Sequence, residues 1–108
     1  MSGGGSDGTY VPPVRKKVVV SCEKLVVETV LMQPNEELVA ILTVGQVLTV
    51  HVKDGSVYVM FGDQIVGYVE TPQNDKIIEC MEAGTFYVAD IKDLKETTCK
   101  VEIHSLQL

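Results

Sequence analysis

Few residues of this chain have the types and spacing of a reaction centre. Neither histidine, His51 or His104, has a neighbour in sequence at the spacing of a metal-binding or nucleophilic motif. The zinc motif H-E-x-x-H, the nucleophile turn G-x-S-x-G and the phosphate loop G-x-x-x-x-G-K-[ST] are missing. We therefore expect a protein that is not an enzyme and that binds no cofactor and no metal.

Two residues, Asp90 and His51, could belong to a ligand-binding or catalytic pocket. Asp90 interrupts the apolar run FYVADI with a charge. It is either an outward residue on an edge strand, where a charge opposes aggregation, or an inward carboxylate that marks a ligand pocket. His51 could also meet Cys80 or Cys99 in space as a nucleophile pair. A small-ligand or enzymatic pocket at the mouth of a barrel, around Asp90 or His51, is thus one alternative function.

The number and spacing of the cysteines do not predict disulfide bonds. Cys22, Cys80 and Cys99 are an odd number at wide spacing, and no C-x-x-C pair occurs. A disulfide framework or a thiolate metal site is therefore not expected. We interpret the three as reduced, largely buried thiols of a cytoplasmic protein.

Length and charge narrow the range of partners. A chain of 108 residues forms one domain. Its net charge of −6 disfavours nucleic acid, because phosphate binding relies on clustered Lys and Arg. The one basic cluster, Arg15, Lys16 and Lys17, is either a solvated edge or an anchor for an acidic partner or a phosphate. No apolar run approaches the ~18 residues of a membrane span, so no membrane partner is expected.

The chain divides into a tail and a domain. Residues 1–13, MSGGGSDGTYVPP, predict a disordered tail, since Gly and Ser are flexible and the proline pair prevents a strand. Residues 14–108 predict a single β-barrel-like domain. Valine is abundant there, and its branched side chain favours strands.

A short segment occurs twice, as NEELVAILTVG in residues 35–45 and as NDKIIECMEAG in residues 74–84. In each copy the asparagine predicts an N-cap and the acidic residues complement the helix dipole. The glycine at the end of each copy, Gly45 or Gly84, predicts the helix terminus. Because a β-rich run follows each copy, the chain predicts two repeated ββαβ units around one core.

The dipeptide Asp54-Gly55 predicts a hairpin with a two-residue type I′ turn. That turn fixes a register in which the inward pairs are apolar, and a one-residue slip would expose them all. The inward pairs are Val52 with Val57, Val50 with Val59, and Leu48 with Phe61; the outward pairs are His51 with Tyr58 and Thr49 with Met60.

The remaining β-rich runs complete the predicted fold. We expect further strands over residues 18–20, 24–31, 64–70, 85–92 and 98–104. The fold class is mainly β with two short helices (α+β). Short strands with hairpin links favour a small antiparallel six- to seven-stranded β-barrel or curled sheet, with a helix at each open end.

Residues 62–103 resemble the second half of a HIRAN domain. The resemblance is carried by Gly67-Tyr68-Val69, by a helix with Ile77, Ile78 and Met81, and by Gly84, Tyr87, Ala89 and Ile91. It implies a six-stranded barrel with two helices, found beside nucleases and helicases, some of whose members bind the 3′ ends of single-stranded DNA. The chain departs from the family where members carry Asn-x-x-Asp-x-x-Ala, because GSVYVMFGDQI stands at that place.

The function that we expect is a non-catalytic interaction module of a small bacterial protein. A protein partner would engage the outer face of the hairpin or an unpaired edge strand. The alternative that the resemblance implies is a HIRAN-type binder of single-stranded DNA ends, with exposed aromatic rings stacking on bases. The candidate interaction surface consists of His51, Tyr58, Met60, Tyr68 and Tyr87.

Overall fold

The structure is a computed structural model in which residues 21–106 are described. The predicted tail (1–13), the predicted strand over 18–20 and the basic cluster Arg15, Lys16 and Lys17 lie outside the described residues. Within 21–106, no helix has the length and apolarity needed to cross a membrane.

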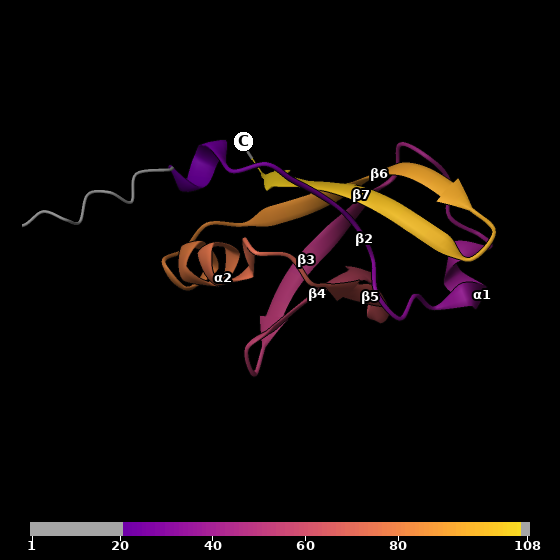
Figure 1. Cartoon of the computed structure of the whole chain (residues 1–108), viewed down its shortest axis with the longest axis horizontal. Helices are drawn as coiled ribbons and strands as arrows, with labels where there is room; N and C mark the ends of the chain where they lie inside the picture. Colours follow the sequence, from indigo (N-terminus) through magenta and orange to yellow (C-terminus); the bar gives the residue numbers. More distant parts are fainter. Residues whose placement is uncertain (1–20, 107–108) are drawn as a thin grey trace, which may run out of the picture.

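One six-stranded antiparallel sheet, strongly curled into a half-barrel, makes up most of the described chain (Figure 1). The two α-helices lie at opposite ends of this sheet, as predicted (Figure 1). The order of the strands across the sheet is β2-β7-β6-β3-β4-β5. The strands are β2 (Val27–Val30), β3 (Val47–Lys53), β4 (Ser56–Phe61), β5 (Gln64–Val69), β6 (Tyr87–Lys95) and β7 (Thr98–Ser105); the helices are the 3-10 helix η2 (Cys22–Lys24), α1 (Glu36–Val39) and α2 (Asn74–Glu82).

The predicted hairpin is present with its predicted turn. Asp54 and Gly55 have φ of +53° and +79°, which are the two positive angles of a type I′ turn. The register of β3 and β4 confirms the inward valine pairs and the outward pair His51 with Tyr58. Phe61 is the exception, since it is 39% exposed. It ends β4 beside the Gly62-Asp63 turn, at the end of the sheet, where the core no longer covers it.

The core lies inside the curl of the sheet. Burial alternates along β3, β4 and β7, whereas β5 and β6 contain consecutive buried residues, and α1 and α2 add buried side chains from the two ends. The side chains with 1% exposure or less include Leu48, Val59, Ile77, Ile91 and Ile103. The inner face is thus filled by packed aliphatic groups, and polar side chains of the strands gather on the outer face.

The segment that follows β2 turns toward β5 and joins the two edges of the sheet at one point. Met32 donates its N–H to the carbonyl of Tyr68 (2.8 Å) and accepts from the N–H of Tyr68 (2.9 Å). A Cβ on Gly67 would lie 2.8 Å from the Cβ of Leu31, closer than two such atoms can approach. Only glycine fits at this position of β5, because another part of the backbone approaches so closely.

The two repeated segments differ at their starts. Asn35 caps α1 as predicted, since its side-chain oxygen accepts from the N–H of Glu37 (3.1 Å) and Leu38 (3.2 Å). The same prediction is wrong for Asn74, because Gln73 holds the N-cap position of α2. The Asn74 amide instead donates to the carbonyl of Val69 (2.8 Å) and so ties the helix start to β5.

They differ at their ends as well. Gly84 directly follows the C-cap of α2 and has φ of +109°, which confirms its predicted role as the residue that ends the helix. Gly45 does not end α1, which is already capped at Ala40. Gly45 instead donates its N–H to the carbonyl of Ile91 (2.8 Å), because the loop after α1 runs beside β6. From β2 onward the element order of the predicted repeat holds, whereas the two helices differ in length; the first predicted strand lies outside the described residues.

The cysteine prediction is wrong for two of the three residues. Cys22 of η2 and Cys80 of α2 form a disulfide across a sequence separation of 58. Folding brings them together because η2 packs beside α2, a tertiary contact that the spacing of the two residues does not reveal. Cys99 is free and buried, as expected.

Candidate functional site

Three rings stand side by side on the outer face of the sheet. His51, Tyr58 and Tyr68 occupy matching register positions on β3, β4 and β5. The rings of His51 and Tyr58 are stacked with centroids 5.8 Å apart and planes 19° apart. The rings of Tyr58 and Tyr68 are 6.0 Å apart and tilted by 53°. We call these three residues the aromatic row.

Strand alternation and one hydrogen-bonded hydroxyl hold the row in place. Val50, Val57 and Val59 point inward, so the residues between them must point outward. The Thr49 hydroxyl lies 2.9 Å from the Nε2 atom of His51 and donates to a main-chain carbonyl of β4 (3.3 Å). The His51 ring is thus fixed from its own strand and from the neighbouring one.

Two apolar side chains extend the row. Met60 lies opposite Ile65 in the register of β4 and β5, and it also pairs with Thr49 of β3. Met60 is partly exposed and Ile65 is 38% exposed. The structure therefore brings His51, Tyr58, Met60 and Tyr68, four of the five predicted surface residues, onto one face of three consecutive strands.

Tyr87, the fifth predicted member, does not belong to this surface. It is 2% exposed, and its hydroxyl donates to the main-chain carbonyl of Cys22 (2.6 Å). Burial raises the pKa of the Tyr87 phenol above its ordinary value. The prediction failed because Tyr87 points inward on β6, while its neighbour Phe86, which was not predicted, is 71% exposed.

Open hollows surround the tip of the hairpin, and each contains a carboxylate. One hollow is lined by Tyr58 and Tyr68 together with Lys53 and Asp54. A second includes Tyr68 and Glu70. The third lies between the hairpin and α2, and its lining includes His51, Asp54 and Glu82. The aromatic row is thus bordered by acidic side chains at the points where a ligand could enter.

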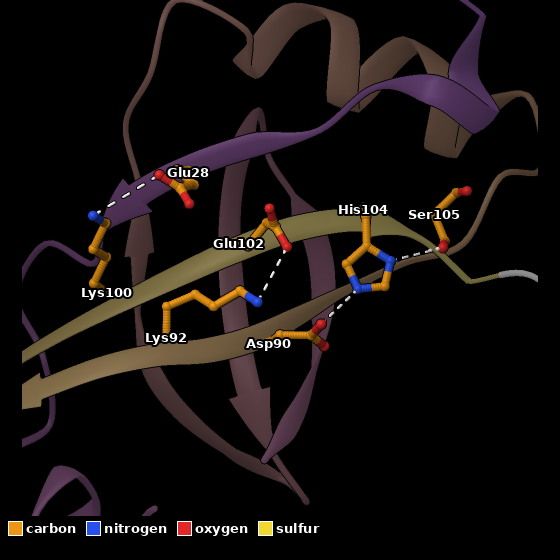
Figure 2. A network of polar contacts seen from close by, with 7 residues as sticks. All are labelled: Glu28, Asp90, Lys92, Lys100, Glu102, His104 and Ser105. Atoms are coloured by element: carbon orange, nitrogen blue, oxygen red, sulfur yellow. Dashed lines mark hydrogen bonds and ion pairs between the residues drawn. The ribbon is translucent and has the colours of Figure 1, made fainter. Parts of the chain in front are cut away.

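A second feature of the outer face is a row of three carboxylates on neighbouring strands (Figure 2). Glu28 of β2 lies opposite Glu102 of β7, and Glu102 lies opposite Asp90 of β6. Like charges directly opposite each other destabilise a sheet. Each carboxylate has its own cation: Lys100 lies 3.8 Å from Glu28, Lys92 lies 3.5 Å from Glu102, and His104 lies 2.9 Å from Asp90.

His104 makes the closest of these contacts, and both of its ring nitrogens face acceptors. Nε2 lies 2.9 Å from the Asp90 carboxylate, and Nδ1 lies 3.0 Å from the carbonyl of Ser105 (Figure 2). Burial alone lowers the pKa of His104, but the two hydrogen bonds and the attraction of Asp90 and Glu102 outweigh it and raise the pKa above its ordinary value. The imidazolium satisfies both acceptors, because it donates from both nitrogens.

The structure places Asp90, Cys80 and Cys99 differently from the pocket and the nucleophile pair considered from the sequence. Asp90 does not lie on an edge strand, because β6 runs between β7 and β3. It points to the outer face and meets His104, so the inward carboxylate is also wrong. Cys80 is held in the disulfide, and Cys99 is enclosed in the core, where burial raises the pKa of its thiol. Neither cysteine can therefore act as a nucleophile with His51.

The row of carboxylates was not predicted from the sequence, although the sequence does indicate the outward face of β7, which contributes Glu102 to it. Alternation in β7 does predict that Lys100, Glu102 and His104 share an outward face. The pairing of that face with Glu28 and Asp90 depends on a strand order that alternation does not reveal. Within residues 21–106, no group of three or more His, Cys, Asp or Glu has an arrangement that could hold a metal ion.

No family model, no curated protein and no solved structure matches this chain. The resemblance to a HIRAN domain therefore stays a prediction.

Proposed function

We propose that this chain is a non-catalytic binding module that holds a segment of a protein partner on the aromatic row. The observation that carries the proposal is the contact of three partly exposed rings, at 5.8 and 6.0 Å, across three consecutive strands. Such a surface has no role in the core, which lies on the other side of the sheet.

The residue types support a protein partner. Tyrosine and methionine are enriched at the centres of protein interfaces, and tyrosine offers a large contact area at a small cost in side-chain entropy. Met60 and Ile65 continue the row with apolar surface. Because these side chains stand on paired strands and not on loops, the surface is already organised before a partner arrives.

The charge of the chain separates this proposal from its alternative. A HIRAN-type binder of single-stranded DNA ends would use the same rings as stacking platforms and would need cations beside them. The hollows around the row contain Asp54, Glu70 and Glu82 and the single cation Lys53. Together with the net charge of −6, this arrangement repels a phosphate backbone.

A peptide selection tests the proposal directly. A displayed library of random 12-residue peptides is selected against the immobilised protein, and the enriched peptides are synthesised with a fluorophore. We expect fluorescence anisotropy to show binding that Tyr58→Ala weakens by about tenfold, as for a central interface residue. Lys95→Ala, an exposed change on β6 away from the row, serves as the control and should leave the affinity unchanged.

The DNA alternative is tested in the same assay. A fluorescein-labelled ten-residue oligothymidylate is titrated at 20 and 150 mM salt, since the electrostatic contribution is largest at low salt. Binding of this oligonucleotide, weakened by Tyr58→Ala, with no peptide enriched by the selection, would replace our proposal by DNA-end binding. Circular dichroism of each variant confirms that its fold is intact.

A further inference from the structure

We infer that the aromatic row binds cationic side chains, chiefly arginine, presented at alternate positions of an extended basic segment. This inference rests on the proposed function and names the chemistry of the partner. Three independent properties of the site lead to it: the charge around the rings, the chemistry of the rings and the distance between them.

The charge around the row is the first property. Each of the three hollows that adjoin the rings has a carboxylate in its lining: Asp54, Glu70, or Asp54 with Glu82. The one lysine of these linings, Lys53, lies beside Asp54 in two of the hollows, and the hollow with Glu70 contains no lysine or arginine. Carboxylates thus outnumber lysines around the row, and a basic segment laid across it would meet an excess of opposite charge, which speeds association and disfavours acidic partners.

The chemistry of the rings is the second property. The face of a tyrosine ring attracts a cation, and the planar guanidinium of arginine can also stack on that face. Tyr58 and Tyr68 are both partly exposed, and together with Asp54 they line one hollow. A cation in this hollow would lie near two tyrosine rings and the Asp54 carboxylate, and it would share the hollow with Lys53. An apolar side chain could use the rings but not the carboxylate.

The distance between the rings is the third property. Successive centroids in the row are 5.8 and 6.0 Å apart. In an extended segment, side chains on the same side recur every second residue, at about 6.6–6.8 Å. Two cations separated by one residue can therefore lie over neighbouring rings, whereas two adjacent cations point to opposite sides of their segment.

Three synthetic peptides test the inference. The first, fluorescein-GVRVRVRG, places arginine at alternate positions. The second replaces each arginine by citrulline, which keeps the shape and removes the charge. The third, fluorescein-GVVVRRRG, has the same composition with the arginines adjacent. We expect the first peptide to bind at least about fivefold more tightly than the citrulline peptide and about two- to fivefold more tightly than the adjacent isomer.

Variants of the row identify where the first peptide binds. Tyr58→Leu and Tyr68→Leu remove a ring and keep apolar bulk, and each should weaken binding by about two- to fivefold. Tyr68→Phe keeps the ring face and should bind nearly as well as the wild type. Lys95→Ala should not change the affinity. A diffuse attraction between a basic peptide and an acidic protein would respond to salt but not to the two leucine variants.

Equal affinities for the arginine and citrulline peptides would overturn the inference, and so would leucine variants that bind as well as the wild type. The proposed function fails separately. If the library selection yields peptides that depend on Tyr58 but contain no basic residues, the binding module stands and the cationic partner is wrong. If no peptide depends on Tyr58, both are wrong.

Discussion

Asp90 and Glu102 lie directly opposite each other on β6 and β7, yet each carboxylate is neutralised by a different cation. Glu102 has Lys92 at 3.5 Å, while Asp90 has His104 at 2.9 Å. The charge of His104 depends on pH, because an imidazole titrates near neutrality. The stability of this part of the sheet should therefore respond to pH through a single residue.

The first prediction is a loss of stability with rising pH that depends on His104. Its raised pKa means that the contribution of the ion pair is complete below the unfolded value of about 6.5 and is lost as the pH rises through the folded value. In urea unfolding from pH 5.5 to pH 8.5, the wild type should lose about 0.2–1 kcal/mol more than His104→Gln, the range of a partly exposed pair. Gln64→Ala, an exposed change on β5, is the control and should keep the wild-type slope. A slope that His104→Gln leaves unchanged would contradict the assignment.

The second prediction concerns the disulfide between Cys22 and Cys80. It closes a loop across a separation of 58 residues, so its loss should lower the free energy of unfolding by about 2–4 kcal/mol. Urea unfolding of the double variant Cys22→Ala/Cys80→Ala measures this difference. Intact mass under denaturing conditions, with and without reductant, checks the bond itself, and alkylation without reductant should label Cys99 alone. Labelling of all three cysteines in the unreduced protein would show that the bond does not form.

The third prediction is that replacing Gly67 destabilises the fold. In Gly67→Ala, the new Cβ would meet Leu31 at 2.8 Å and the carbonyl of Met32 at 3.2 Å, so the segment after β2 must move away. We expect a loss of about 1–3 kcal/mol, as for overpacking. Amide hydrogen exchange should accelerate at Met32 and Tyr68, whose N–H groups form the bridge. Gln64→Ala, an exposed change on the same strand, is the control; slow exchange in both variants would argue against the close contact.

The fourth prediction concerns the buried hydroxyl of Tyr87. Tyr87→Phe removes the donor to the Cys22 carbonyl and should cost about 0.5–1.5 kcal/mol, the typical net value of such a bond. Tyr58→Phe also removes a hydroxyl, but from a partly exposed ring, and should change the stability little. Thermal or urea unfolding of the two variants gives the comparison. Equal stabilities would mean that the hydroxyl of Tyr87 contributes nothing to the attachment of η2.

Local sequence signals predicted the parts of the fold that depend on neighbours in the chain. Asp54-Gly55 fixed both the turn and the register of β3 and β4, because a two-residue turn leaves no freedom in the pairing. Asn35 and Gly84 were correctly predicted as helix ends, because a helix cap also depends on residues a few positions away in the sequence. The pair of His51 with Tyr58 in the aromatic row followed from the hairpin register, since residues opposite each other in a hairpin share a face. Tyr68 was predicted only as an exposed aromatic residue, and its place beside Tyr58 was not predicted.

Contacts between distant parts of the chain could not be predicted from the sequence. The disulfide joins residues of η2 and α2, which become neighbours only after the sheet has curled. The pair of Asp90 with His104 requires the register of β6 and β7, whose pairing shifts at an irregularity near Ile91. Tyr87 was placed on the surface because its residue type suits an interface, whereas the parity of β6 turns it inward.

Since outer and inner residues alternate along β3 and β4, and Tyr68 of β5 lies between the buried residues Gly67 and Val69, the outer face can be altered independently of the inner one. A library that varies His51, Tyr58, Met60 and Tyr68 would leave the valines beneath them untouched. The chain can thus serve as a scaffold for engineered affinity reagents, in which specificity is rewritten on one side of a ribbon while the other side keeps the shape.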